Sequence, residues 1–181
     1  MLIIKSLFNK IKKINHSASL KYNENRKINY PAQFEPQNSP VFVHNEIQIN
    51  ASPESVWSWL TNAPSWPDWY FNAANIELLL QKGEQLENDS KFRWKTFGNN
   101  LESEVKEFVP NERIAWMAIG TGINAYHAWL IIPTLYGCKV ITEETQHGWM
   151  CRLGKVLFPK RMFNYHQIWL EGLKAKAEND Q

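Results

Sequence analysis

Between residue 72 and about residue 147, apolar and polar side chains alternate along the chain in short runs. In one run, Phe92 and Trp94 flank Arg93, and turn residues such as Gly98 and Asn99 separate this run from the next. Successive side chains of a strand point to opposite faces, so a period of two indicates strands with one buried face. The pattern predicts a meander of six short antiparallel strands.

A further strand and two short helices are predicted before this meander. Residues 41–49 have strand composition. Ser52 is a suitable N-cap and Pro53 suits the first position of a helix. Residues 63–69 contain two prolines and two tryptophans, which end this helix and begin a second short one.

The C-terminal segment has the spacing of a long amphipathic helix, predicted from about residue 157 to 178, with Pro159 in or near its first turn. Such a helix is about 30 Å long. Its wide apolar face includes Leu153, Val156, Leu157, Phe163, Trp169, Leu170 and Leu173. A helix of this length needs a partner surface, so we expect an α+β fold in which a curved antiparallel sheet of about seven strands surrounds it. The space between helix and sheet is a natural ligand cavity.

The first forty residues differ in character from the rest. Residues 2–14 alternate apolar side chains with lysines at helical spacing, which is compatible with weak contact to a membrane surface. A helix packed on its own domain or on a partner, or a loosely ordered arm, explains the pattern equally simply, and we favour these readings. Residues 15–40 are polar and contain three prolines, which predicts an extended linker.

Composition narrows the function classes. The 181 residues suit one domain with an appendage, and a net charge of +2 argues against a nucleic-acid binder. Cys138 and Cys151 form no C-x-x-C pair, which favours a reducing compartment. Neither a secretory signal pattern nor an apolar run of roughly 20 residues occurs, so we expect a cytoplasmic protein, with peripheral membrane contact as an option. The sequence leaves the oligomeric state open.

Several short motifs in a fixed order carry a resemblance to a known superfamily. They occupy residues 49–57, 66–69, 92–94, 105–110, 113–116, 127–129 and 142–144. Together they resemble the Bet v 1/START-like (SRPBCC) superfamily, in particular its polyketide cyclase/dehydrase-like branch of small bacterial proteins. The resemblance implies a helix-grip fold. It divides the chain into an N-terminal extension and linker, residues 1–40, and a ligand-binding domain, residues 41–181. The superfamily includes lipid carriers, hormone receptors and cyclases, so the resemblance fixes no activity.

His127 and Glu144 are the candidate polar pair, and the only candidates for catalysis. They fall on strands that are neighbours in a meander, so a hydrogen bond between them is possible if both face the cavity. Such a pair could orient a ligand carbonyl or hydroxyl, or act as an acid–base pair. A purely structural pair at the rim of the sheet is an equally good interpretation.

Aromatic residues are the candidate cavity lining. Together with His127 and Glu144, the predicted ligand-binding residues are Phe92, Trp94, Trp116, Trp129, Phe163, His166 and Trp169. Plain core packing is the commoner fate of aromatic side chains at this spacing. We expect no metal site, because the five histidines are scattered along the sequence, and no cofactor, because glycine-rich phosphate and dinucleotide motifs do not occur.

Three functions remain open at this point. The first is a non-catalytic protein that binds a small hydrophobic or amphipathic molecule, such as a lipid, fatty acid or aromatic metabolite. The second is a cyclase- or dehydratase-like enzyme in which His127 is the general base and Glu144 orients it. The third is an interaction module without a ligand, in which tryptophans fill the cavity. We favour the first.

Overall fold

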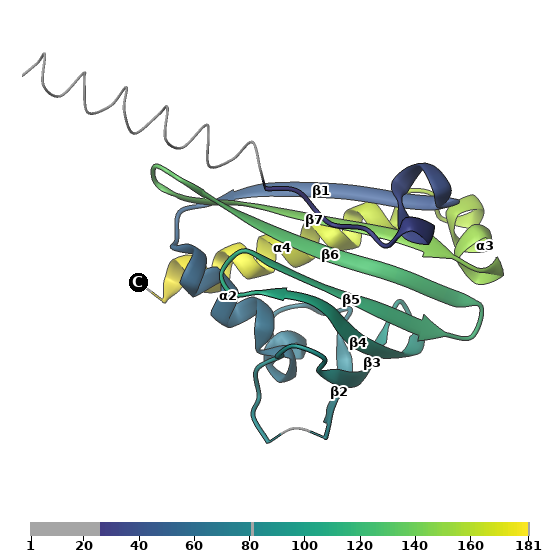
Figure 1. Ribbon diagram of the computed structural model, residues 1–181, viewed down its shortest axis with the longest axis horizontal. Helices are drawn as coiled ribbons and strands as arrows, with labels where there is room; N and C mark the ends of the chain where they lie inside the picture. The colour runs from purple at the N-terminus through teal and green to yellow at the C-terminus, as the bar shows by residue number, and fades with distance from the viewer. Residues whose placement is uncertain (1–25, 81, 181) are drawn as a thin grey trace, which may run out of the picture.

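One antiparallel sheet of seven strands dominates the computed structural model, which describes residues 26–80 and 82–180 (Figure 1). Its spatial order is β1-β7-β6-β5-β4-β3-β2, so the first and last strands of the chain lie side by side. The strands are β1 (Val41–Ile49), β2 (Ala74–Leu79), β3 (Lys91–Thr96), β4 (Asn99–Val109), β5 (Arg113–Gly120), β6 (Ile123–Thr134) and β7 (Gly137–His147). The predicted meander and the α+β helix-grip fold are confirmed.

Short helices follow β1, as the sequence predicts. They are α2 (Pro53–Thr61) and the 3-10 helix η3 (Ala63–Asp68). The Ser52 side chain accepts a hydrogen bond from the Ser55 backbone N–H at 3.2 Å, which satisfies a donor that the first turn leaves free.

The C-terminal helical segment is two helices rather than one. They are α3 (Trp149–Leu157) and α4 (Arg161–Asn179). The predicted start of a single helix at about residue 157 is therefore corrected, because Phe158 is non-helical and Pro159 lies between the two helices. Proline disfavours helical geometry in the residue before it, which accounts for the break at Phe158.

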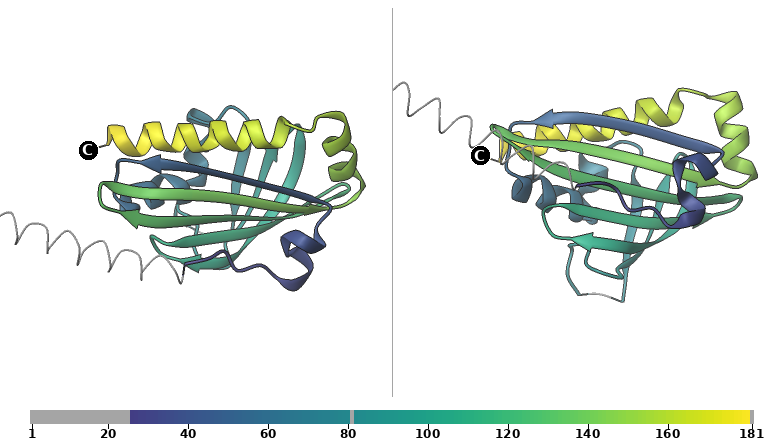
Figure 2. Two further views of the ribbon diagram at one scale, coloured as in Figure 1. Left: turned by 90° about the horizontal axis from the view of Figure 1, so that it is seen from above. Right: turned by 45° about the horizontal axis from the view of Figure 1, so that its top comes forward.

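Helix α4 lies along the concave side of the sheet (Figure 2). A cluster of aromatic rings, which we call the tryptophan cluster, fills the space between them over part of its length. Its members are Trp66, Tyr70, Phe92, Trp94, Trp116, Trp129 and Trp169. Trp66 from η3 stacks on Trp116 with ring centroids 5.7 Å apart and meets Trp169 edge-on at 5.1 Å. The Trp66 indole N–H donates to the backbone oxygen of Leu60 at 3.1 Å, so its one polar atom is satisfied.

The opposite face of the sheet carries residues 26–40 (Figure 2). This segment includes two single-turn 3-10 helices, η1 (Ala32–Phe34) and η2 (Pro36–Asn38). Phe34 is buried against Tyr126, and Arg26 forms an ion pair with Glu112 at 3.2 Å. The described part of the predicted linker is thus packed on the sheet. The possible membrane contact through residues 2–14 lies outside the described residues.

Candidate functional site

A cavity of about 350 Å³ lies between the sheet and the helices α3 and α4. Much of its lining is apolar, including Leu101, Ala118, Ile123, Met150, Leu157 and Phe158. The polar lining includes His127, Glu144, Gln146 and His166. The predicted cavity between sheet and C-terminal helix is therefore present, but α3 forms one of its walls.

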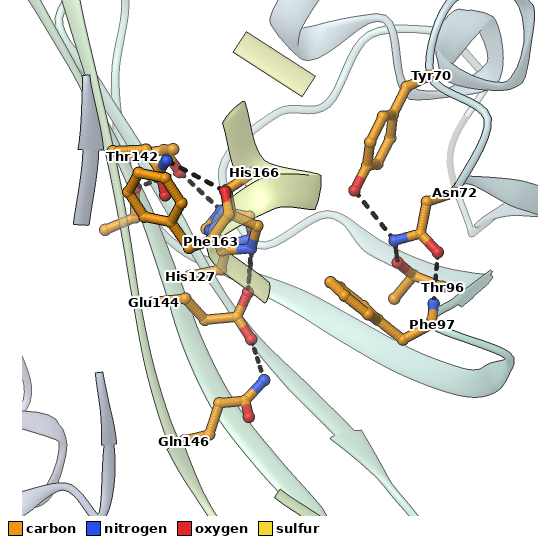
Figure 3. A network of polar contacts seen from close by, with 12 residues as sticks. Tyr70, Asn72, Thr96, Phe97, His127, Thr142, Glu144, Gln146, Phe163 and His166 are labelled. Carbon is orange, nitrogen blue, oxygen red and sulfur yellow. Dashed lines mark hydrogen bonds and ion pairs between the residues drawn. The ribbon is translucent and has the colours of Figure 1, made fainter. Parts of the chain in front are cut away.

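Three buried polar side chains from three different elements meet at this cavity (Figure 3). His127 on β6 and Glu144 on β7 are directly opposite one another in the strand register. His127 Nδ1 is 3.3 Å from Glu144 Oε2, and His166 Nε2 on α4 is 3.2 Å from the same oxygen. The expected neighbour relation of His127 and Glu144 holds, and His166 completes a group that we call the His–Glu–His cluster.

Hydrogen bonds from neighbouring side chains hold two members of this cluster. His127 Nε2 and Thr142 Oγ1 are hydrogen-bonded at 2.8 Å. The Gln146 amide donates to Glu144 Oε1 at 2.5 Å. The imidazole rings of His127 and His166 lie nearly parallel, with centroids 4.8 Å apart. Each ring is at least 98% buried, so the sheet and α4 together fix their positions.

Burial and charge shift the pKa values in this cluster. Burial lowers the pKa of His127 to about 3, and this effect outweighs the nearby carboxylate, which acts in the opposite direction. For Glu144, burial by itself raises the pKa, but the two histidines and Gln146 lower it to about 2. At neutral pH the site therefore holds a carboxylate beside a neutral His127 imidazole.

The predicted aromatic residues divide into two groups. Trp94, Trp116 and Trp169 line the cavity together with the His–Glu–His cluster. Phe92 and Trp129 are fully buried but do not line it, because they pack among other rings. The ring centroids of Phe92 and Trp66 are 5.9 Å apart, and those of Trp129 and Trp169 are 5.1 Å apart. For these two residues, the core-packing interpretation applies.

Phe163 is the third aromatic residue that the structure places elsewhere. Its side chain is 48% exposed and does not line the cavity. Its backbone oxygen accepts a hydrogen bond from Asn45 on β1 at 3.2 Å. Because β1 is an edge strand, the first turn of α4 lies over the edge of the sheet, and Phe163 reaches solvent.

Helix α3 and the residues after it supply lining that the sequence analysis missed. Met150, Cys151, Leu157 and Phe158 belong to this group, as does Arg161 at the start of α4. The Arg161 guanidinium carbon lies 5.4–5.7 Å from the ring centroids of three aromatic side chains. The signal in the sequence was Pro159, because a break there allows the preceding helix to turn away from α4.

A second polar network holds the rim near the turn from β3 to β4 (Figure 3). The Asn72 amide donates to the Tyr70 hydroxyl at 3.0 Å and to Thr96 Oγ1 at 2.9 Å. Its carbonyl oxygen accepts from the Phe97 backbone N–H at 2.9 Å. Phe97 lines the cavity with a positive φ of 51°, a conformation that this network stabilises.

A sheet wrapped around a C-terminal helix, with an apolar cavity between them, defines a helix-grip protein of the hydrophobic-ligand-binding kind. The chain belongs to the family described as polyketide cyclase/dehydrase and lipid transport, whose model matches residues 41–178. A search of curated proteins found no match. Among the described residues, no helix is both long and apolar enough to cross a bilayer.

Solved structures agree with this assignment. The hypothetical protein jhp0584 from Helicobacter pylori is 30% identical, with 84% of this chain and 96% of that chain covered and a TM-score of 0.78. An aromatase/cyclase, ZhuI from Streptomyces sp. R1128, is 13% identical over 77% of this chain and 94% of its own, with a TM-score of 0.65. Norcoclaurine synthase from Thalictrum flavum is 13% identical over 77% and 95%, with a TM-score of 0.60. The last two likenesses concern the fold alone.

Proposed function

We propose that this protein binds a small amphipathic molecule, such as a lipid, a fatty acid or an aromatic metabolite, in the cavity between the sheet and helices α3 and α4. The observation that carries the proposal is a cavity of about 350 Å³ with an extensive apolar lining and one cluster of buried polar side chains. Ligand pockets in proteins usually have volumes of about 300–1,000 Å³ and this kind of lining. Burial of the apolar part of the ligand would supply most of the affinity.

The polar groups would fix the orientation of the ligand. Within the described residues, Arg161 has no carboxylate ion-pair partner. It lines the cavity, and its guanidinium lies over the rings of Phe97 and Tyr165. A ligand carboxylate would pair with this guanidinium, since arginine binds carboxylates with two parallel hydrogen bonds. The His–Glu–His cluster would contact a second polar group of the ligand, such as a carbonyl or hydroxyl.

Binding without chemistry is favoured over acid–base catalysis. An efficient general base has a pKa near the working pH. Burial lowers the pKa of His127 to about 3, so its imidazole is a weak base at neutral pH. The cyclase- or dehydratase-like alternative retains one supporting observation, the 3.3 Å contact between His127 and Glu144. It requires that substrate binding raises the basicity of His127.

A glycine that lines the cavity allows a direct test of ligand binding. Gly154 on α3 lines the cavity, and an added Cβ there meets no atom within 4 Å. Because the Cβ position is unobstructed, Gly154→Phe should occupy part of the cavity and lower the affinity for a fluorescent fatty-acid analogue at least about tenfold. Gly83→Phe is the matched control, because Gly83 is equally unobstructed but does not line the cavity.

Native mass spectrometry of the full-length protein, before and after extraction with organic solvent, would identify a co-purified ligand. A Gly154→Phe protein that retains both the co-purified mass and the wild-type affinity would contradict binding in this cavity. Unchanged affinity in Gly83→Phe is required for the comparison to hold.

A further inference from the structure

The His–Glu–His cluster has the donor set of a metal site. His127 and His166 offer one imidazole nitrogen each and Glu144 offers a carboxylate oxygen, and these three atoms lie within 4.8 Å of one another. We propose that His127, Glu144 and His166 bind a divalent transition metal ion, of which zinc is the best match. Two histidines and one glutamate form a known three-ligand set for zinc, with the fourth position left to water or substrate.

Two of the three distances between donor atoms match those around a tetrahedral ion, and the two histidine donor atoms lie within 4.8 Å of one another. Bonds of about 2.0 Å in a tetrahedral site hold neighbouring donor atoms about 3.3 Å apart. The distances from Glu144 Oε2 to His127 Nδ1 and to His166 Nε2 are 3.3 and 3.2 Å. The sequence argument against a metal rested on scattered histidines, yet the sheet and α4 bring two of them together.

Outer contacts hold two of the three proposed ligands in the way metal sites usually require, whereas His166 Nδ1 has no hydrogen-bond partner among the described residues. Histidine ligands usually use their second ring nitrogen for a hydrogen bond, and carboxylate ligands are hydrogen-bonded in turn. His127 would bind the ion through Nδ1 and donate from Nε2–H to Thr142 Oγ1, at the observed 2.8 Å. The Gln146 amide already donates to the second oxygen of Glu144.

Charge and access also favour an ion at this place. Within the described part of the chain, the basic side chains in contact with the Glu144 carboxylate are His127 and His166, and no lysine or arginine reaches it. A divalent ion would neutralise the charge of this buried carboxylate more completely than imidazole groups do. The cluster lines the cavity, so the open fourth position would face the ligand of the proposed function. Metal binding itself does not depend on that ligand.

Cobalt provides a spectroscopic test. The full-length protein is treated with a chelator, then titrated with Co2+ and with Zn2+ at neutral pH. Wild-type protein should show the intense visible absorption of tetrahedral cobalt, and zinc should displace it. Glu144→Gln keeps the size of the side chain and should lose more than about 100-fold in affinity. Thr142→Val, an outer contact, should lose about 10- to 100-fold.

His44→Gln is the matched control, because His44 also contacts a carboxylate, that of Glu143, but lies exposed on the sheet. Its cobalt spectrum and affinity should equal those of the wild type. Melting curves verify that each variant is folded. A wild-type protein without tetrahedral absorption, or a folded Glu144→Gln protein with wild-type affinity, would overturn the proposal. Fatty-acid binding measured with chelator present separates this result from the test of the proposed function.

A separate observation concerns the outer surface of α3. Its large apolar side chains are substantially exposed, although Leu153 and Leu157 also border the cavity, and Phe158 directly after it does the same. Trp149 is 61% exposed and Val156 is 76% exposed. The exposed apolar residues are Trp149, Leu153, Val156, Leu157 and Phe158, and we call them the α3 surface. A group of large apolar side chains exposed side by side commonly marks a surface that binds another molecule or a membrane.

The charged residues of α3 and of the first half of α4 are all positive. Arg152, Lys155, Lys160 and Arg161 lie among these apolar residues, and no aspartate or glutamate occurs between residues 149 and 170. We infer that the α3 surface docks on an anionic lipid bilayer. Apolar side chains mixed with lysine and arginine on one short helix are typical of helices that lie in the bilayer interface. A second copy of this chain would bring like charges together, which disfavours self-association through this surface.

Vesicle flotation tests the docking. Full-length protein should bind phosphatidylcholine vesicles that contain phosphatidylserine, bind pure phosphatidylcholine vesicles weakly, and leave the anionic vesicles at high salt. Val156→Glu and Lys160→Glu should each lower binding at least about fivefold. Leu135→Glu is the control, since Leu135 is 69% exposed in the turn between β6 and β7. Vesicle binding that survives both α3 substitutions and is lost when Lys12 and Lys13 become glutamate would overturn the inference, as would equal loss in the control.

Discussion

The two halves of α4 face interiors of different kinds. Its C-terminal half packs against α2 and the tryptophan cluster, and Ser55 on α2 donates a hydrogen bond to the Ala177 backbone oxygen at 3.1 Å. Its N-terminal half borders the cavity, which Arg161, Met162 and His166 line. Both halves lie over the same sheet face.

The difference comes from what the second layer supplies. On the filled side, η3 and the residue pair after it place Trp66 and Tyr70 inward, and Tyr70 stacks on Trp169 with centroids 4.5 Å apart. On the open side, Leu153 and Leu157 of α3 line the cavity and remain about half exposed, so they do not fill the space beneath the helix. In this domain the cavity therefore lies where α3, and not the aromatic residues of η3, covers the sheet.

Removing a ring from the filled half should have the largest effect. Trp66 is fully buried and contacts Phe92, Trp94, Trp116 and Trp169. Trp66→Ala should lower the free energy of unfolding by about 3–5 kcal/mol, because it loses apolar burial and leaves a large void. Urea denaturation of both proteins measures the change.

Phe163→Ala is the comparison for this substitution. Phe163 is half exposed, so the same kind of truncation should cost less than about 1 kcal/mol. If the two substitutions cost the same, the tryptophan cluster is not the part of the molecule that stabilises the fold.

Enlarging an alanine should separate the two halves more finely. Ala63 is fully buried in the tryptophan cluster, and Ala118 lines the cavity. Ala63→Leu should lower stability by about 1–3 kcal/mol, since a filled core has no room for extra methyl groups. Ala118→Leu should cost less than about 1 kcal/mol because its added atoms enter the cavity. Thermal melting with matched urea curves decides, and an equal cost at the two sites would mean that the cavity is closed in solution.

Sequence reasoning succeeded where one local pattern determined the outcome. Alternation fixed the strands, and strand order in a meander placed His127 opposite Glu144. Sequence reasoning failed where the position of a side chain depends on several segments that are distant in the sequence. Whether Phe92 lines a cavity or packs in a core depends on Trp66, which belongs to another element and whose orientation alternation does not specify.

The candidate site shows the same limit. His166 was predicted near the cavity from helical spacing, but its meeting with Glu144 depends on how α4 crosses the sheet. The cavity wall formed by α3 was missed because Leu153, Val156 and Leu157 were assigned to the buried face of one continuous helix. The break at Pro159 reverses that assignment, since it lets α3 take a direction of its own.

The smallest expected effect is a difference in reaction rate between the two cysteines. Cys151 lines the cavity and is 7% exposed, whereas Cys138 is fully buried in the filled half. Burial raises the pKa of the Cys151 thiol to about 11 and that of Cys138 to about 12, so both are protonated thiols at neutral pH. Because the thiolate is the reactive form, alkylation should be slow at both sites and should accelerate for Cys151 as the pH rises.

Cys151 lines the cavity, so occupancy of the cavity should slow its reaction with a reagent. A maleimide should modify Cys151 several-fold faster than Cys138 in the folded protein, and a saturating fatty acid should slow the first reaction without changing the second. Peptide mass spectrometry after timed quenching gives both rates in one sample. If Cys138 is modified before Cys151, the accessible interior lies in the half that contains the tryptophan cluster, which contradicts the prediction. If a fatty acid protects both cysteines equally, it stabilises the whole fold and does not act by occupying the cavity.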